Sequence, residues 1–325
     1  MKSKEVLVSI SCITYNHVQY IRQCLDGFLM QQTNFAFEVL IHDDCSTDGT
    51  TEIIKEYELM YPDIIKPIYE KENQYQQGKP SGSVVWNFPR AQGKYIAMCE
   101  GDDYWIDPLK LQKQVDFLDA NPEYSMCFHD VYRIVDNQKA DQYRQYESSK
   151  DVPIEDIILN GGLFCPTASM IFRLELLGGY PELANKCHVG DYPLQIYLAL
   201  AGKVYFCSDI MGCYRIGVPG SWTESMRKAE RSVIISKMEN EIEMLNNFNT
   251  YSNNQYSSIF IQRINIYKLR TYISLRDKVG VKECYPLVRD MKIKDQVLCF
   301  LVVNNMSFVI DLYKFVKTLC CTTTT

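Results

Sequence analysis

The chain has 325 residues, a net charge of −6, and 46% hydrophobic and 12% aromatic residues. This length and composition can fill the core of one large domain and an appendage of roughly 100 residues. The acidic balance excludes a general nucleic-acid binder, which needs a basic surface to meet phosphate charge.

The chain contains 13 cysteines, an odd number, and no Cys-x-x-Cys pair. Several lie in apolar, strand-like runs, where a reduced cysteine acts as a small hydrophobic residue. The pattern indicates a reducing cytosol rather than a disulfide framework. The amino-terminal residues lack the apolar core of a signal peptide, and no apolar run reaches the roughly 20 residues of a spanning helix. We therefore expect a cytoplasmic protein, and peripheral binding to the inner face of the cell membrane stays open.

Strand and helix patterns alternate over the first two-thirds of the chain, which is typical of a parallel sheet covered by helices. Strands are expected at residues 6–12, 37–42, 64–69, 95–99, 124–131, 204–206 and 210–214. Helices are expected at residues 17–31, 50–61, 83–92, 109–121 and 192–201. Residues 132–160 are polar and loop-rich, and we expect a flap or insertion there.

From residue 224 onward the pattern is helical only, with amphipathic runs at 224–248 and 257–275. We therefore expect an α/β domain over residues 1–222 and an all-helical region over residues 223–325. The segment 297–316 is apolar but contains Asn304, Asn305 and Asp311. A buried or partner-facing helix pair is expected there, with contact to a membrane surface as the alternative.

Polar clusters follow three of the expected strands. They are Thr14-Tyr15-Asn16, Asp43-Asp44 and the segment from Glu100 to Trp105. Functional groups of an open parallel sheet gather at the carboxyl ends of its strands. We therefore expect the three clusters to lie on one rim of the sheet.

The acidic segment Glu100-Gly101-Asp102-Asp103 carries three carboxylates within four residues. Unpaired carboxylates at this spacing raise one another's pKa values. A Mg²⁺ or Mn²⁺ ion suits one or two carboxylates together with diphosphate oxygens and water. Gly101 is expected to give the backbone the turn that brings the carboxylates inward. The pattern predicts a metal site at Asp102, supported by Asp103, whereas Asp107 is expected only to cap the next helix.

Asp43 and Asp44 are candidates for binding a nucleoside, because a carboxylate accepts hydrogen bonds from base N–H groups and ribose hydroxyls. Tyr15 is a candidate to stack beside the base, and Asn16 to hold the turn. Asp48 is expected to cap the following helix.

Transfer to a hydroxyl group needs a base, since a neutral hydroxyl is a weak nucleophile. Asp191, which follows Gly190 at the start of an expected helix, is the candidate base, with plain helix capping as the alternative. The helix N-terminus is expected to keep its carboxyl ionised. Arg215 is a candidate for the diphosphate, because a guanidinium matches two phosphate oxygens at once.

In order along the chain, these motifs resemble glycosyltransferase family 2, a large inverting family with the GT-A fold. The resemblance covers residues 5–217 and rests on VSISCITYN at 8–16, IHDDCSTDGT at 41–50, and GKYIA at 93–97 followed by the acidic segment. It implies a Rossmann-like, mostly parallel central sheet with flanking helices.

The resemblance also implies site residues. Thr14, Tyr15, Asn16 and Asp44 would bind the nucleotide, with Asp43 alongside. Asp102 would bind the metal, and Glu100 stands where the family has the first aspartate of its D-x-D motif. The longer glutamate leaves a ribose contact and a metal contact both open. Asp191 falls where the family's E-D base motif is expected, with Gly190 in place of the glutamate.

The function implied by the resemblance is inverting transfer of a sugar from a nucleotide-diphosphate sugar, with UDP-sugars as the commonest donors and Mn²⁺ or Mg²⁺ as the cofactor. The acceptor would be a lipid-linked or protein-linked glycan in surface polysaccharide or glycoconjugate synthesis. The helical region would provide acceptor, membrane-surface or oligomer contacts. Two alternatives are an inactive GT-A scaffold in a glycan-assembly complex and a sugar nucleotidyltransferase. The second normally has a Gly-rich basic loop after the first strand, which residues 14–17 do not provide.

Overall fold

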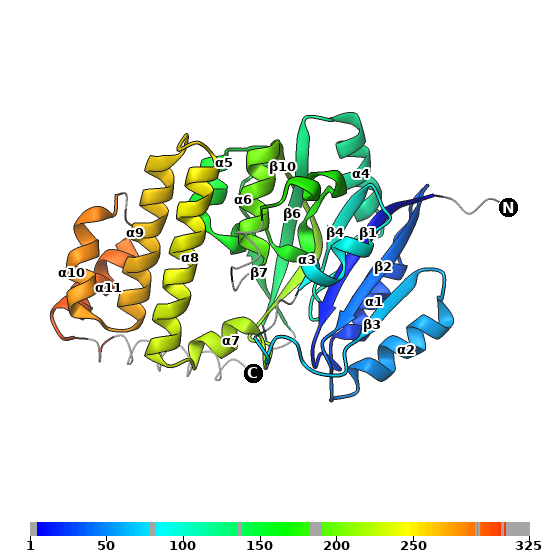
Figure 1. Cartoon of the computed structure of the whole chain (residues 1–325), viewed down its shortest axis with the longest axis horizontal. Coiled ribbons are helices and arrows are strands. Elements are labelled where there is room, and N and C mark those ends of the chain that lie inside the picture. Colours follow the sequence, from blue (N-terminus) through cyan, green and yellow to red (C-terminus); the bar gives the residue numbers. More distant parts are fainter. Residues whose placement is uncertain are drawn as a thin grey trace. The chain divides into compact units, whose positions relative to one another are not determined.

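The computed structural model describes residues 5–78, 82–135, 138–181, 187, 190–289, 291, 293–306 and 309. The chain divides into two compact units, Met1–Arg227 and Lys228–Thr325. The first unit is α/β and the second is helical (Figure 1). The boundary expected from the sequence falls at the start of the short helix α7 (Trp222–Arg227), which ends the first unit.

Ten strands form a single sheet in the described part of the first unit. Strand β1 (Val6–Thr14) lies between β2 (Ala36–Asp43) and β4 (Tyr95–Met98), and β3 (Ile65–Tyr69) lies beside β2. These four strands run parallel to one another. The carboxyl ends of this half of the sheet therefore meet at one edge.

The other half of the sheet is built on two long strands, β6 (Tyr124–Val135) and β10 (Lys203–Ile216), which run parallel to each other. Strand β9 (Ile171–Arg173) lies antiparallel between β4 and β6 and joins the two halves. The remaining strands pair antiparallel with β10 or β6 and are β5 (Tyr104–Trp105), β7 (Gln138–Tyr143) and β8 (Lys150–Val152). The α/β GT-A-type architecture is thus confirmed, with a mixed sheet whose amino-terminal half is parallel.

Helices flank this sheet (Figure 1). Those of the first unit are α1 (Ile21–Leu29), α2 (Thr50–Met60), α3 (Ser83–Trp86), α4 (Lys110–Ala120), α5 (Ile154–Asn160), α6 (Asp191–Ala201) and α7. Short 3₁₀ turns cover Phe88–Arg90, Gly162–Phe164, Thr167–Ser169 and Leu174–Gly179. In α1 the buried side chains of Ile21, Leu25 and Phe28 recur at helical spacing, which gives it one apolar face toward the core.

A hydrophobic core anchors the strand ends that carry the polar clusters. Val8, Ile10 and Cys12 of β1 are fully buried and belong to one cluster that also contains Phe28 and Trp105. Successive strand residues point to opposite faces, so these alternate positions share one face of the sheet. The loops after β1, β2 and β4 therefore start from a closely packed base.

Residues 132–160 contain more regular structure than the loop-rich segment expected from the sequence. Strand β6 continues to Val135, and β7, β8 and α5 follow it. Strand β7 reads QKADQY and is largely exposed, so it lacks the alternation of apolar and polar residues that identifies a strand in sequence. Its backbone pairing with β6 keeps it extended.

Two other element boundaries also differ. The strands expected at 204–206 and 210–214 form the single strand β10, whose pairing with β6 shifts register between Cys207 and Ile210. The helix expected at 83–92 is the short α3 followed by the Phe88–Arg90 turn. Pro89 removes a backbone donor at this point, which favours the break.

The second unit consists of helices in its described part. They are α8 (Arg231–Tyr251), α9 (Ser257–Ser274), α10 (Lys278–Cys284) and α11 (Ile293–Val303), with a 3₁₀ turn at Tyr285–Leu287. Their core contains Leu269, Val281 and Val302. Of the apolar segment 297–316, the end of α11 is described, whereas residues 307, 308 and 310–316 lie outside the described residues. The described helices include none that combines the length and the apolar character needed to cross a bilayer.

Candidate active site

The three polar clusters lie at one end of the parallel strands, as the sequence predicts. Thr14 and Asp43 are register partners at the ends of β1 and β2. The backbone N–H of Gly101 donates to the carbonyl of Ile13 at 3.0 Å, and that of Asp44 donates to the carbonyl of Thr14 at 3.1 Å. Backbone hydrogen bonds therefore join the loops after β1, β2 and β4 into one rim.

Asn16 connects the first two loops. Its φ of +55° lies in the left-handed region, which asparagine adopts more readily than most residues. Its backbone N–H donates to Ser46 Oγ at 2.9 Å, and its Oδ1 accepts from the backbone N–H of Thr47 at 2.8 Å. These contacts agree with the expectation that Asn16 holds the turn.

The carboxylates of Asp43 and Asp44 brace the loops that follow them. Asp43 is 1% exposed; its Oδ1 accepts from the Ser46 hydroxyl at 2.6 Å, and its Oδ2 accepts from the Thr51 hydroxyl. Asp44 accepts from the backbone N–H groups of Gln74 at 2.7 Å and Tyr75 at 3.1 Å. Asp43 thus ties the loop to the start of α2, and Asp44 ties it to the segment after β3.

Tyr15 lies beside that same segment, since its hydroxyl accepts from Gln76 Nε2 at 3.3 Å. Two expected caps also agree with the structure. Asp48 accepts from the backbone N–H of Thr50 at 3.0 Å, and Asp107 accepts from that of Leu109 at 2.8 Å. Both carboxylates therefore bond the backbone where a helix begins.

Gly101 is required for a different reason from the one expected. A Cβ at this position would lie 2.6 Å from Thr14 Oγ1 and 3.0 Å from His17 Nδ1. Gly101 is not among the glycines with positive φ. The glycine therefore permits close packing of two loops, and the backbone turn itself does not demand it.

The adjacent carboxylates Asp102 and Asp103 have different surroundings. Asp102 Oδ2 lies 3.9 Å from His17 Nε2, and His17 Nδ1 contacts Thr14 Oγ1 at 3.1 Å. Asp103 is 1% exposed, and its Oδ1 accepts from the backbone N–H of Arg215 at 2.8 Å. Its Oδ2 is buried and has no hydrogen-bond partner among the described residues. Asp102 is thus the more accessible of the two.

Four carboxylates act on one another in this region. Burial, with the charges of Asp102 and Asp191 beside it, raises the pKa of Glu100 to about 8. Burial, together with the Asp102 and Glu100 charges, also raises the pKa of Asp103 well above its ordinary value. The structure therefore brings Asp191 into electrostatic range of the acidic segment, although 88 positions separate Asp103 from Asp191 in the sequence.

Tyr214, which precedes Arg215 in β10, was not assigned a role of its own in the site from the sequence. Burial raises the pKa of its phenol, and the charges of Asp103, Glu100, Asp102 and Asp191 raise it further. All four carboxylates therefore act on this phenol electrostatically. No local sequence signal marks it, because a tyrosine within an apolar strand is usually a core residue.

A divalent cation fits this acidic segment only if other ligands complete its coordination. The described residues contain no group of three His, Cys, Asp or Glu side chains able to hold a metal by themselves. Burial and the neighbouring carboxylates raise the pKa values of Glu100 and Asp103, so a cation bound beside them would favour their ionised forms. Mg²⁺ and Mn²⁺ typically take one or two carboxylates and complete their coordination with phosphate oxygens and water. The site therefore suits a cation that binds together with a diphosphate.

Asp191 is the first residue of α6, as expected from the sequence. Its Oδ1 accepts from the backbone N–H of Tyr192 at 2.8 Å. Gly162 passes close to this carboxylate, because a Cβ there would lie 3.1 Å from Asp191 Oδ2. Gly162 is a second position that sequence reasoning missed.

Arg215 directs its guanidinium toward protein groups. Nη1 donates to the carbonyl oxygen of Asp102, and Nη2 donates to Gln23 Oε1 on α1. The side chain is buried, at 8% exposure. The structure thus places Arg215 behind the acidic segment, in contact with its backbone.

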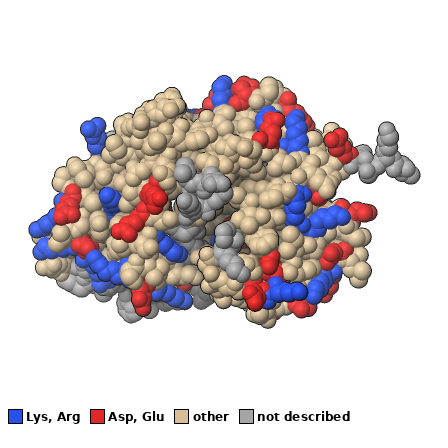
Figure 2. Space-filling model, in the orientation of Figure 1, with Lys and Arg blue, Asp and Glu red and all other residues tan. Residues whose placement is uncertain are grey.

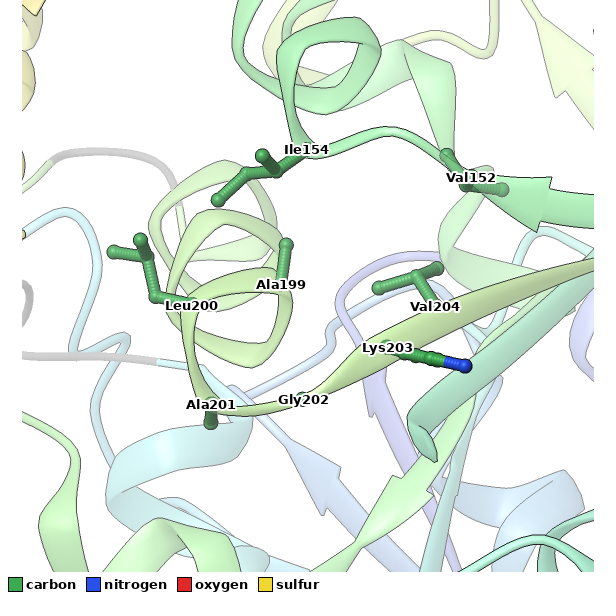
Figure 3. A pocket seen from close by; sticks show the side chains of 8 residues that line it. All are labelled: Val152, Ile154, Ala199, Leu200, Ala201, Gly202, Lys203 and Val204. Carbon is green, nitrogen blue, oxygen red and sulfur yellow. The ribbon is translucent and has the colours of Figure 1, made fainter. Parts of the chain in front are cut away.

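Two cavities lie away from this rim. The first has a volume of about 290 Å³ and lies between β8, the start of α5, the end of α6 and the start of β10 (Figure 3). Helix α6 has 11 residues, so about 15 Å separates its last turn from Asp191 at its start. The second, of about 810 Å³, is lined by Val6, Phe35 and Lys94 near the amino ends of the parallel strands. Neither belongs to the acidic site.

Charged side chains on the face shown in Figure 2 are mixed in sign. Lysine and arginine are interspersed with aspartate and glutamate over the described residues of that face.

Parallel strands that deliver an acidic segment and two polar loops to one rim define a protein of the GT-A class. Residues 9–178, just over half of the chain, match the family model "Glycosyl transferase family 2". The chain belongs to glycosyltransferase family 2.

Bacterial relatives share parts of this sequence. An uncharacterised Mycobacterium tuberculosis protein is 37% identical over 220 residues, which cover 66% of this chain and 60% of that protein. The chain thus matches less than two-thirds of the length of this relative. An uncharacterised glycosyltransferase of Nostoc is 28% identical over 79% of this chain and 76% of its own. A Bacillus subtilis protein named for teichuronic acid biosynthesis, TuaG, is 36% identical over 36% of this chain and 44% of its own.

Solved structures share the fold. S. aureus TarS (residues 1–349), in complex with UDP, has a TM-score of 0.54 at 19% identity and covers 94% of this chain and 92% of its own. The mannosyltransferase PcManGT from Pyrobaculum calidifontis, in complex with GDP-Man and Mn²⁺, has a TM-score of 0.53 at 15% identity. The match covers 98% of this chain and 84% of that protein. At these identities the likeness supports the GT-A fold alone.

Proposed function

We propose that this protein is a metal-dependent, inverting glycosyltransferase that moves a sugar from a nucleotide-diphosphate sugar, with a UDP-sugar as donor, to a hydroxyl of a glycan acceptor. One observation carries the proposal: backbone hydrogen bonds join the loops after β1, β2 and β4 into one rim, and this rim carries the carboxylates of Glu100, Asp102 and Asp103. Asp191 lies near enough for its charge to raise the pKa of Glu100. Family membership supports the reaction class.

The donor's nucleoside is assigned to the loops after β1 and β2. Tyr15 borders the segment that Asp44 holds, so a base placed against Tyr15 would lie within reach of the Asp44 carboxylate. Hydrogen bonds of Thr14 to His17, of Asn16 to Thr47 and of Asp43 to Ser46 fix the backbone of these loops. The complexes of TarS with UDP and of PcManGT with GDP-Man and Mn²⁺ support a nucleotide donor of this kind.

The metal is assigned to Asp102, with Asp103 as its buried support and Glu100 as a ribose or metal contact. Asp102 is 9% exposed, against 1% for Asp103, so it is the carboxylate that can meet a diphosphate. A bound Mn²⁺ or Mg²⁺ would neutralise charge that develops on the leaving nucleoside diphosphate. Gly101 lets the loop that carries these residues pack against Thr14.

Asp191 is assigned as the base. Its carboxylate would take the proton of the acceptor hydroxyl as that oxygen bonds to the anomeric carbon. The bond from that carbon to the diphosphate oxygen breaks in the same step, and the nucleoside diphosphate leaves with the electron pair. Attack opposite the leaving group inverts the anomeric configuration. The contact with the Tyr192 N–H fixes the direction of the Asp191 side chain.

The acceptor is assigned to a surface polysaccharide or a related glycoconjugate. Support comes from TuaG, whose name places it in teichuronic acid biosynthesis. In the second unit, Ile293, Val297 and Phe300 of α11 are 79%, 52% and 59% exposed. Their spacing puts them on one face of the helix, which suits contact with the membrane surface that carries a lipid-linked acceptor.

Release of nucleoside diphosphate tests the function. The purified chain is incubated with UDP-, GDP- and dTDP-sugars and a glycan acceptor, with Mn²⁺ or with EDTA. We expect release with Mn²⁺ and one nucleotide class, and none with EDTA. Asp191→Asn should lower the rate at least about 100-fold, since a general base contributes roughly 10²–10⁴-fold. Asp102→Asn should lower it by a similar factor, because it removes the carboxylate assigned to the metal. Asp107→Asn, a carboxylate outside the site, should stay within about 2-fold of the unmodified protein.

The same assay decides against the alternatives. An inactive scaffold is the alternative because Gly190 stands where the family has glutamate; among the described residues, no atom lies within 4 Å of a Cβ built at this position. A scaffold would release no diphosphate in any condition, and a nucleotidyltransferase would instead release pyrophosphate from a nucleoside triphosphate.

Cosedimentation with anionic vesicles tests the α11 assignment. Replacing Ile293, Val297 and Phe300 by serine should abolish cosedimentation of the protein. Loss of a dimer in the same variant would instead assign that face to a second copy of the chain.

A further inference from the structure

Arg215 contacts both Asp102 and Asp103, one through its guanidinium and the other through its backbone N–H. Its backbone N–H donates to Asp103 Oδ1 at 2.8 Å, and its Nη1 donates to the carbonyl oxygen of Asp102. One residue of β10 therefore binds a side chain and a backbone oxygen of two consecutive residues.

The rest of the guanidinium is enclosed. Nη2 donates to Gln23 Oε1 on α1, and the guanidinium carbon lies 4.8 Å from the centre of the Tyr20 ring and 4.6 Å from that of the Tyr104 ring. A guanidinium at these distances is attracted to the face of an aromatic ring. The Arg215 side chain is thus held by Tyr20, by Gln23 of α1 and by Tyr104 of β5.

A guanidinium enclosed in this way is poorly placed to bind a diphosphate. Both terminal nitrogens donate to protein oxygens, and the two rings flank the guanidinium. Reaching a phosphate would require Arg215 to give up the Asp102 carbonyl, the group that places the proposed metal ligand. The position is therefore suited to holding the acidic segment from behind.

We infer that Arg215 is the positioning residue of the metal site, in place of the diphosphate contact expected from the sequence. This inference rests on the proposed function and deepens it. Holding the Asp102 carbonyl fixes the backbone from which the Asp102 carboxylate projects, and the bond to Asp103 Oδ1 turns that carboxylate inward. Asp102 is then presented to the metal in one orientation before any ligand binds.

Arg215→Lys separates positioning from charge, because lysine keeps the charge but lacks the planar fork that reaches Asp102 and Gln23 together. Arg173→Lys is the matched control. Arg173 is also buried, at 7% exposure, and its guanidinium donates to the backbone carbonyls of Tyr124 and Leu118, but it pairs with the amino end of β4. The two variants lose similar contacts at opposite ends of the sheet.

Two affinities are measured on the full chain: that of Mn²⁺ in the presence of UDP, by the electron paramagnetic resonance signal of free Mn²⁺, and that of UDP in EDTA, by calorimetry. We expect Arg215→Lys to weaken Mn²⁺ binding about 10-fold or more, as loss of residues that orient metal ligands typically does. Its UDP affinity in EDTA should stay within about 2-fold, and Arg173→Lys should change neither. Gln23→Leu, which removes one guanidinium partner, should weaken Mn²⁺ binding in the same direction and serves if Arg215→Lys does not fold.

Three results would overturn the inference. Unchanged Mn²⁺ affinity in both Arg215→Lys and Gln23→Leu would show that the segment holds its shape without this arginine. An equal loss of UDP affinity in EDTA would assign Arg215 to the diphosphate. If the unmodified protein binds neither UDP nor Mn²⁺, the proposed function itself fails, and the role of Arg215 fails with it.

Discussion

His17 Nε2 lies 3.9 Å from Asp102 Oδ2, so the loop after β1 reaches the acidic segment through a side chain as well as through the backbone. The other ring nitrogen, Nδ1, contacts Thr14 Oγ1 at 3.1 Å. A nucleotide bound at the first loop and a metal bound at Asp102 would therefore share this histidine as a neighbour. Binding of either one is expected to depend on how closely the two loops pack.

Gly101→Ala tests that dependence. The added Cβ would lie 2.6 Å from Thr14 Oγ1 and 3.0 Å from His17 Nδ1, and Thr14 is too short and too buried to move aside freely. We expect a loss of roughly 1–3 kcal/mol in the free energy of unfolding, as for other overpacked sites. UDP affinity should fall as well. Urea denaturation and calorimetry measure the two quantities.

Gly178→Ala is the control, because no atom of the described residues lies within 4 Å of a Cβ at that position. It should leave both quantities unchanged. If Gly101→Ala also kept full stability and UDP affinity, the close approach of the two loops would have no consequence for binding.

Glu100→Gln should remove a pH dependence of stability. The pKa of Glu100 is raised to about 8 in the folded protein, mainly by burial, whereas its ordinary value is 4.5. The unfolded chain therefore releases this proton at lower pH than the folded protein does. In EDTA, the free energy of unfolding should fall as the pH rises from about 5 to 8.

The glutamine variant lacks this ionisation, so at pH 8.5 in EDTA its Tm should exceed that of the unmodified protein by roughly 2–6 °C. At pH 5 the two should agree, because Glu100 is protonated in the folded protein. Thermal scans across this pH range measure the difference, and a Tm gap that does not grow with pH would contradict the assignment.

The rim formed by the loops after β1, β2 and β4 was predictable from the sequence, because each of these loops directly follows an apolar strand. Thr14, Asp43 and the segment after β4 could be assigned to one end of a parallel sheet from strand patterns alone. The caps at Asp48 and Asp107 were predictable for the same reason, since capping is a local interaction.

The rest of the site depends on contacts that have no local signal. The bond from Arg215 to Asp103 joins residues 112 positions apart, and the sequence assigned that arginine to the diphosphate on chemical type alone. The charges of four carboxylates act on Tyr214 because β10 pairs with β5, which directly follows the acidic segment. Strand β7 was missed because its exposed, polar residues form a strand through pairing with β6 rather than through burial.

Lys110→Met should stabilise the protein near neutral pH. Lys110 is fully buried at the start of α4, and burial lowers its pKa to about 7 from an ordinary value of 10.5. The folded protein releases this proton more readily than the unfolded chain, so the free energy of unfolding should rise as the pH increases from about 7 to 10. Below pH 7 the folded protein carries a buried charge, whose Nζ lies 3.9 Å from the centre of the Trp105 ring.

That ring attraction offsets part of the burial cost, so the expected gain for Lys110→Met at pH 6 is about 1–2 kcal/mol. The gain should vanish by about pH 10, where the lysine is neutral in the folded protein. Lys113→Met is the contrast: its exposed ammonium lies 2.8 Å from Asp107 and 2.7 Å from Asp209, so its loss should destabilise slightly. Urea denaturation at pH 6 and pH 10 checks both, and a gain that persists at pH 10 would exclude the titration of Lys110 as its cause.

The second unit contains a buried ion pair between α8 and α9, in which Arg263 Nη2 lies 2.8 Å from Glu241 Oε1. Both side chains are less than a tenth exposed. Glu241→Leu leaves the arginine charge buried beside an apolar group and should cost about 3–5 kcal/mol. Hydrogen exchange of the α8 and α9 amides measures the loss within this unit.

The double variant Glu241→Leu with Arg263→Met should recover most of that stability, because removing both charges removes the cost of burying either one. Recovery would show that the attraction within the pair mainly offsets the cost of burying its two charges. Apolar packing would then be what holds α8 against α9. If the double variant were as unstable as Glu241→Leu alone, the arginine would contribute through further contacts, and the pair could not be treated as an isolated unit. Amides of the first unit serve as the internal reference, since their exchange should be the same in all three proteins.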